Sequence, residues 1–384
     1  MSSLTCRVAV TLAVGTLALA HPATARAATE TVLFSFNNTG SGSTGYQPQG
    51  GLIDVSGTLY GTTVWGGTYG IGTVYSVTLS GAQEDVHSFA GGSTDGSHPL
   101  VGLSATGTTI YGTTSAGGGT KCSGKGCGTV FMIAPDGTET IVANRFSHSR
   151  GWFLQGGVTA VGKSLYGLGY QGGADGVGTV YKVTSAGALT NIHSFNSDTD
   201  GRQPVASMLN VHGSLYGVAL NGGTFGGGTL YSVTPRGTLT VLHAFGSTGD
   251  GLYPSAGLID VGGTLYGTTE AGGAANQGTV YSMTLDGTET ILHSFAGDDG
   301  NGPDTALLKI GGKLYGGSGG GGTHNAGTLF QLSLQGDFHV LHSFGAKKDG
   351  QVPNGDLLDV DGTLFGTTED GGAYGLGTVF SVTP

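Results

Sequence analysis

The sequence predicts an all-β fold, namely a seven-bladed β-propeller of four-stranded antiparallel blades. A Leu-Tyr-Gly phrase, or a close variant of it, recurs seven times at intervals of 49 to 55 residues. A period near 50 residues with strand-like content is typical of propeller blades. No segment shows the periodicity of an amphipathic helix. The aromatic residues of the phrase are Tyr60, Tyr111, Tyr166, Tyr216, Tyr266, Tyr315 and Phe365.

The first 27 residues are predicted to be a signal peptide. Arg7 precedes an apolar run at 8–20, and Ala25-Arg26-Ala27 fits a cleavage site of small residues. The run is short for a membrane span, although a retained anchor is the alternative. We therefore expect residues 28–384 to form a single propeller domain without a transmembrane span. We expect it to be secreted, periplasmic or at the cell surface.

The fifth repeat shows the four strands of one blade in order. Residues 257–261 form a short first strand, and Gly262-Gly263 turns into a second strand at 264–269. A Gly-rich loop leads to a third strand at 279–284. Asp286-Gly287 then makes a two-residue hairpin, because Gly accepts positive φ without steric cost. The fourth strand, 288–295, ends in Leu-His-Ser-Phe.

Aromatic side chains recur at two further positions of each repeat. Large rings at fixed strand positions, opposite small residues of the next sheet, predict a core between stacked blades. The third-strand rings are Tyr75, Phe131, Tyr181, Tyr231, Tyr281, Phe330 and Phe380. The fourth-strand rings are Phe36, Phe89, Phe146, Phe195, Phe245, Phe295 and Phe344.

The seventh repeat stops after three strands, at Pro384. Residues 29–36, Thr-Glu-Thr-Val-Leu-Phe-Ser-Phe, resemble the fourth strand of the fifth repeat, Thr-Glu-Thr-Ile-Leu-His-Ser-Phe. We expect this N-terminal strand to complete the last blade, because such closure removes an exposed sheet edge.

Two cysteines follow the predicted signal peptide. Cys122 and Cys127 flank a four-residue insertion in the longest repeat, and in an oxidising compartment they predict a disulfide. A zinc site would need further ligands nearby, and a free thiol pair is the other alternative. The formal charge of −11 argues against nucleic acid as a partner, because phosphate binding needs a basic face.

Three motifs together are similar to the GloVer-type tandem repeat. They are Gly-x-Leu-Tyr-Gly-Thr-Thr, Gly-Gly-x-x-Gly-x-Gly-Thr-Val-Tyr, and Leu-His-Ser-Phe followed by Asp-Gly-x-x-Pro. The resemblance covers nearly the whole mature chain. It implies a propeller-like exported bacterial protein, and it implies no catalytic residues.

An Asp-Gly step recurs in five of the links between blades. The Asp residues suit turn capping, and calcium binding is the alternative, although calcium needs six to eight oxygens. The first calcium candidates are Asp198, Asp200, Asp298 and Asp299. The five link residues are Asp95, Asp200, Asp250, Asp299 and Asp349.

A second set of residues breaks the repeat in the long loops between second and third strands. Flat rings beside carboxylates and amides suit stacking on sugars. The alternative is a structural role, in which these rings pack on neighbouring loops. The candidate ligand-binding residues are Trp65, Tyr69, Tyr170, Phe225 and Tyr374. The channel at the centre of the ring is the other place where a site is expected.

Five histidines recur at one position of the fourth strand. Because each lies in a different blade, they should not share one metal, and one structural hydrogen bond per blade is expected. They are His87, His193, His243, His293 and His342.

The sequence favours a monomeric binding module for a polysaccharide or a surface protein. No cofactor is expected apart from the calcium alternative, and an enzymatic role is the less favoured interpretation. The alternatives are a hydrolase or lyase that acts on polysaccharide, and a structural scaffold of the cell envelope.

Overall fold

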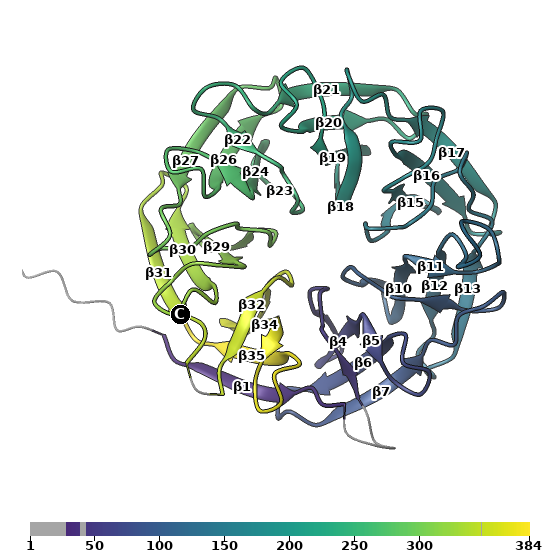
Figure 1. Cartoon of the computed structure of the whole chain (residues 1–384), viewed down its shortest axis with the longest axis horizontal. Helices are drawn as coiled ribbons and strands as arrows, with labels where there is room; N and C mark the ends of the chain where they lie inside the picture. Colours follow the sequence, from purple (N-terminus) through teal and green to yellow (C-terminus); the bar gives the residue numbers. More distant parts are fainter. Residues whose placement is uncertain (1–27, 39–43, 347) are drawn as a thin grey trace, which may run out of the picture.

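A computed structural model describes residues 28–38, 44–346 and 348–384. These residues contain strands and turns but no helix, and the strands form seven small antiparallel sheets around a central channel (Figure 1). The predicted seven-bladed propeller is thus confirmed. None of the described residues belongs to a helix that is long and apolar enough to cross a membrane. The predicted signal peptide lies outside the described residues.

Six blades contain four strands that follow one another along the chain. The first strand of each lies nearest the channel and the fourth forms the outer rim (Figure 1). Blade 1 consists of β3 (Ile53–Val55), β4 (Thr58–Thr63), β6 (Thr73–Thr78) and β7 (Gln83–Ser88). Blade 2 consists of β9 (Ser104–Thr106), β10 (Thr109–Thr114), β12 (Thr129–Ile133) and β13 (Glu139–Ala143). Blade 3 consists of β14 (Thr159–Val161), β15 (Ser164–Gly169), β16 (Thr179–Thr184) and β17 (Leu189–Ser194). Blade 4 consists of β18 (Arg202–Val211), β19 (Ser214–Asn221), β20 (Thr229–Val233) and β21 (Leu239–Ala244). Blade 5 consists of β23 (Ile259–Val261), β24 (Thr264–Thr269), β26 (Thr279–Thr284) and β27 (Glu289–Ser294). Blade 6 consists of β28 (Leu308–Ile310), β29 (Lys313–Ser318), β30 (Thr328–Ser333) and β31 (Phe338–Ser343).

The seventh blade joins the two ends of the chain. It consists of β33 (Leu358–Val360), β34 (Thr363–Gly371), β35 (Thr378–Val382) and the N-terminal strand β1 (Glu30–Ser35). In the antiparallel β1–β35 pair, Glu30 lies opposite Val382 and Ser35 lies opposite Thr378. The predicted closure is therefore confirmed.

Short ribbons connect the links between blades to the loops that follow the second strands. In blade 7, β32 (Gly350–Pro353) extends the sheet by pairing with β34. The other ribbons are β2 (Gly45–Tyr46) with β5 (Trp65–Gly66), β8 (Gly96–Ser97) with β11 (Ala116–Gly117), and β22 (Gly251–Leu252) with β25 (Ala271–Gly272). These contacts hold the long-loop face of the propeller together.

The core consists of ring pairs between neighbouring blades. All the predicted third-strand and fourth-strand rings are at most 1% exposed. Each fourth-strand Phe packs on the third-strand ring of the next blade, as Phe36 does on Tyr75 with their centroids 5.0 Å apart. Rings therefore meet rings across blades, and the small residue that accommodates each ring belongs to the same sheet. Gly61, for example, lies opposite Tyr75.

Candidate functional site

The recurring histidines each pair with the Asp of the following link. The distances from His Nε2 to Asp Oδ2 lie between 2.9 and 3.2 Å in all five pairs. Asp95 also accepts hydrogen bonds from the backbone amides of Ala90 and Gly96. Burial alone would raise the pKa of Asp95, but His87 and these amides lower it overall. One structural hydrogen bond per histidine is confirmed, and the link carboxylates cap their turns as expected.

The calcium candidates lie at two of these turns. Asp200 and Asp299 accept hydrogen bonds from His193 and His293, at 3.0 and 2.9 Å. Asp198 and Asp298 are exposed beside them. Calcium binding at these residues stays a prediction.

The predicted aromatic residues divide into two groups. Tyr69, Phe225 and Tyr374 are about 60% exposed and lie in loops of blades 1, 4 and 7. Trp65 lies edge-on to His98, with centroids 4.5 Å apart. Tyr170 is half-buried against Phe153. The structure thus brings Trp65 and Tyr170 close to one groove, because Phe153 lines it together with Trp65.

This groove, the Trp65 groove, is a cavity of about 630 Å³ on the long-loop face between blades 1 and 2. Its apolar walls include Trp65, Ile71 and Phe153, and Lys125 adds a positive charge. Burial, and then the charge of Lys125, lower the pKa of His98. His98 is therefore neutral at neutral pH and presents an uncharged aromatic face.

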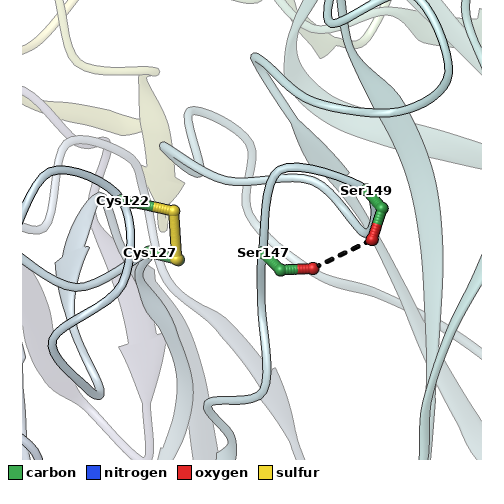
Figure 2. Close-up of a disulfide and its surroundings, with 4 residues drawn as sticks. All are labelled: Cys122, Cys127, Ser147 and Ser149. Atoms are coloured by element: carbon green, nitrogen blue, oxygen red, sulfur yellow. Dashed lines mark hydrogen bonds between the residues drawn. A yellow bond between two sulfur atoms is a disulfide. The ribbon is translucent and has the colours of Figure 1, made fainter.

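A disulfide shapes the edge of the Trp65 groove. Cys122 and Cys127 are bonded, with their Cα atoms 5.3 Å apart, so the predicted disulfide is confirmed. Figure 2 shows this loop beside the turn in which the hydroxyl groups of Ser147 and Ser149 are hydrogen-bonded. Lys125 lies inside the disulfide loop, and its carbonyl oxygen accepts a hydrogen bond from Gly117. The bridge therefore fixes the position of this cationic residue.

The second site is the channel mouth, a cavity of about 440 Å³ at the centre of the ring. Most of its lining comes from the residues that follow the recurring proline, or Leu154 in the third repeat, at or just before the first strand of each blade. Leu220 lies near the end of β19, and Glu270 directly follows β24. On one side Leu100, Val205 and Leu220 form a mainly apolar wall, which Gln155 interrupts. On the other side lie Gln49, Ser255, Glu270, Asp304, Asn354 and Asp356. The scaffold repeats, but this lining does not.

Burial and mutual repulsion perturb the carboxyl groups of the channel mouth. Burial, followed by the charge of Glu270, raises the pKa of Asp304 to about 8, with smaller effects from Asp356 and Glu369. Burial also raises the pKa of Asp356, whose carboxylate accepts a hydrogen bond of 2.8 Å from the Ala306 amide. Asp304 therefore carries a proton at neutral pH.

Several polar atoms of the channel mouth have no partner within the protein. Among the described residues, Ser255 Oγ, Asp304 Oδ1 and Asn354 Oδ1 are buried and unpaired. By contrast, Glu369 accepts hydrogen bonds from Gln49 and Asn354 at 3.1 and 3.0 Å. Buried polar atoms without partners are costly, and their convergence on one cavity indicates a site for hydrogen-bonding groups of a ligand.

The two cavities share a wall. Leu100 lines both the channel mouth and the Trp65 groove. The two cavities are therefore neighbours that meet at Leu100. An elongated ligand can therefore contact both.

A family model described as the Gloeobacter/Verrucomicrobia repeat matches residues 119–280 and 263–384. The chain belongs to this repeat family. This confirms the tandem-repeat family suggested by the three motifs. No curated protein matches the chain.

Among solved structures, this Gloeobacter/Verrucomicrobia repeat protein is similar to a protein of Bacteroides uniformis ATCC 8492. That protein is described as a "putative 6-phosphogluconolactonase". The two share 12% identity with a TM-score of 0.50, over 76% of this chain and 83% of that one. A likeness at this identity shows the fold alone.

The acids of the channel mouth were not singled out from the sequence of this repeat protein. The residues that break the repeat pattern most visibly are the aromatic residues of the long loops, whereas Glu270, Asp304 and Asp356 lie at ordinary repeat positions. A comparison of equivalent positions would have found them. The residues after the recurring proline, or after Leu154 in the third repeat, are Gln49, Leu100, Gln155, Val205, Ser255, Asp304 and Asn354.

Proposed function

We propose that this protein is an exported glycan-binding module that holds a sugar chain across the channel mouth and the Trp65 groove. The observation that supports this most is the channel mouth itself, in which unpaired buried oxygens face an apolar wall. A sugar ring has the same two characters, since it carries polar hydroxyl groups and apolar C–H faces.

The chemistry of the surface favours a particular kind of glycan. Ser255, Asp304 and Asn354 offer oxygens to hydroxyl or amino groups, while Leu100 and Trp65 offer faces to C–H groups. Glu270 and the formal net charge of −11 disfavour uronate-rich chains. We therefore expect a neutral or amino-sugar polysaccharide.

The disulfide supports a location in an oxidising compartment, in keeping with secretion, the periplasm or the cell surface. N-terminal sequencing of the exported protein should find a chain that begins near Ala28. A first residue far upstream would argue for a retained anchor.

A glycan array with matched variants tests the binding function. We expect the wild type to bind neutral or amino-sugar chains, and both Trp65→Ala and the double variant Glu270→Gln/Asp304→Asn to bind at least about tenfold more weakly. The triple variant Tyr69→Ala/Phe225→Ala/Tyr374→Ala serves as the comparison. If only the triple variant loses binding, the ligand lies across the loop tips. If the wild type binds no glycan, the proposal fails.

One observation favours a second function, the hydrolysis of the bound glycan. Asp304 holds a proton at neutral pH beside Glu270, and glycosidases pair a protonated acid with a second carboxylate. New reducing ends should then appear when the wild type, but not Asp304→Asn, is incubated with a bound glycan. If the wild type releases none, hydrolysis is excluded while binding stands.

A further inference from the structure

Three of the blade junctions carry a second carboxylate beside the His–Asp pair. Glu139 joins His87 and Asp95, Glu289 joins His243 and Asp250, and Glu30 joins His342 and Asp349. In each group one atom of each residue lies within 4.8 Å of the others. Glu289 and Glu30 approach the histidine Nε2 to 3.7 and 3.9 Å.

The added Glu occupies one register position of the fourth strand, and it occurs only where a His–Asp pair faces it. That position lies opposite the last core residue of the third strand, as Glu139 lies opposite Ile133. Two junctions lack the histidine, and Phe34 and Ala143 stand in its place. At these junctions the position of the Glu is occupied by Gln83 and Leu189. The remaining two His–Asp pairs face Leu239 and Phe338, and Phe338 stacks on the ring of His293.

The Glu carboxylates at these junctions each have an oxygen without a hydrogen-bond partner among the described residues. The Glu30 side chain is only 5% exposed, yet its Oε1 has no partner among the described residues. The Oε1 atoms of Glu139 and Glu289 are likewise buried and unpaired. Each junction thus places two carboxylates, one of them with an unpaired buried oxygen, beside one imidazole ring.

We propose that each of these three junctions binds one divalent transition-metal ion of the zinc class. One imidazole nitrogen and two carboxylates form a mixed N/O donor set that suits Zn²⁺, and the two negative charges balance a dication. The backbone amides of Ala90 and Gly96 donate to the two carboxylate oxygens of Asp95 and hold it in position, as outer partners of a metal ligand do. His342 is similarly oriented by the backbone of Ala28.

Such an ion would connect two blades at their outer rims. His87 lies in β7 and Glu139 in β13, the fourth strands of blades 1 and 2 (Figure 1). The group with Glu30 ties the closing strand β1 to β31. The metal would therefore stabilise the ring at three junctions, independently of the glycan surface.

Zinc titration of the full purified chain, stripped with EDTA, tests the proposal. In competition with a chromogenic chelator, the wild type should bind three equivalents of Zn²⁺. Each of Glu30→Gln, Glu139→Gln and Glu289→Gln should remove one equivalent, and the triple variant should remove all three. Asp200→Asn, at a junction without the Glu, should still bind three.

A gain of binding is expected as well. Leu239→Glu completes the group of His193 and Asp200 and should raise the stoichiometry to four. Circular dichroism checks that each variant is folded. If the triple variant does not fold, the three single variants are enough to test the proposal. The proposal is overturned if the wild type binds no more Zn²⁺ than the Glu→Gln variants. It is also overturned if five equivalents bind, because each His–Asp pair would then suffice without the Glu.

Discussion

Asp304 differs from the residues at its position in the other repeats because it carries a titratable group on a buried cavity wall. Its repeat equivalents include Leu100, Val205 and Ser255, and none of these can hold a charge. Its proton at neutral pH follows from enclosure and from the nearby charge of Glu270. A single difference between the repeats thus puts an ionisable side chain on the wall of the cavity.

The stability of the protein should depend on the titration of Asp304. Its pKa is raised from 3.8 to about 8. Between these values the native state holds a proton that the unfolded state has released, so the free energy of unfolding falls as the pH rises. The slope from this group is at most about 1.4 kcal/mol per pH unit. Chemical denaturation of the wild type and Asp304→Asn from pH 5 to 8 measures it. Equal slopes would show that Asp304 is ionised throughout.

Residue roles could be predicted from the sequence only where the repeat constrains them. The histidines and link Asp residues recur, so their structural role could be inferred without coordinates. The acids of the channel mouth come from blade 5 and from the two links that follow it, so they meet only when blades 5 to 7 pack side by side. A comparison of equivalent repeat positions marks Glu270 and Asp356 as exceptions, but it does not show that they face a common cavity.

At the level of the blade, the glycine of the Leu-Tyr-Gly phrase matters for packing. Gly267 pairs with Tyr281 on the next strand, and a Cβ atom at Gly267 would lie 2.5 Å from Tyr281 Oη. The Tyr281 ring therefore lies over the glycine, and this explains why the phrase has Gly at its third position.

Gly267→Ala should destabilise the protein by about 1 to 3 kcal/mol, because the buried ring cannot move without displacing its neighbours. Gly312→Ala is the matched control, since a Cβ atom there meets nothing within 4 Å and φ is not left-handed. Denaturation midpoints of the two variants measure the difference. A Gly267→Ala variant as stable as Gly312→Ala would contradict this account of the phrase.

Strand positions were readily predicted because the turns carry strong signals. Gly262-Gly263 and Asp286-Gly287 fix two hairpins of blade 5, and β24, β26 and β27 follow at the expected places. The short ribbons, such as β2 with β5, were not predicted. They pair residues of a link with a loop, and neither segment has an alternating pattern of its own.

For the whole molecule, closure makes the junction between blades 7 and 1 equivalent to the other junctions. Phe36 follows β1 and packs on Tyr75 at 5.0 Å, just as Phe245 packs on Tyr281 at 5.2 Å. Both phenylalanines are fully buried. The number of blades and this closure could be predicted because the missing fourth strand is recognisable at the other end of the chain.

Phe36→Ala and Phe245→Ala should therefore each cost about 3 to 5 kcal/mol of unfolding free energy. The two losses should be similar, because a closed ring has no terminal blade that frays. Equilibrium denaturation of both variants provides the comparison. A loss below about 1 kcal/mol for Phe36→Ala alone would indicate that the ring opens at this junction.

The pairing of β1 with β35 also fixes an order of events in time. During synthesis β1 is the first strand of the propeller to be made and β35 is the last. The edge of β1 therefore stays without its partner strand until almost the whole propeller has been made. Contacts so distant in sequence form slowly, and an unpaired strand edge favours aggregation. The folding of the propeller is thus completed only when its two ends meet. A chain that is released early lacks β35 and leaves β1 exposed as an open edge.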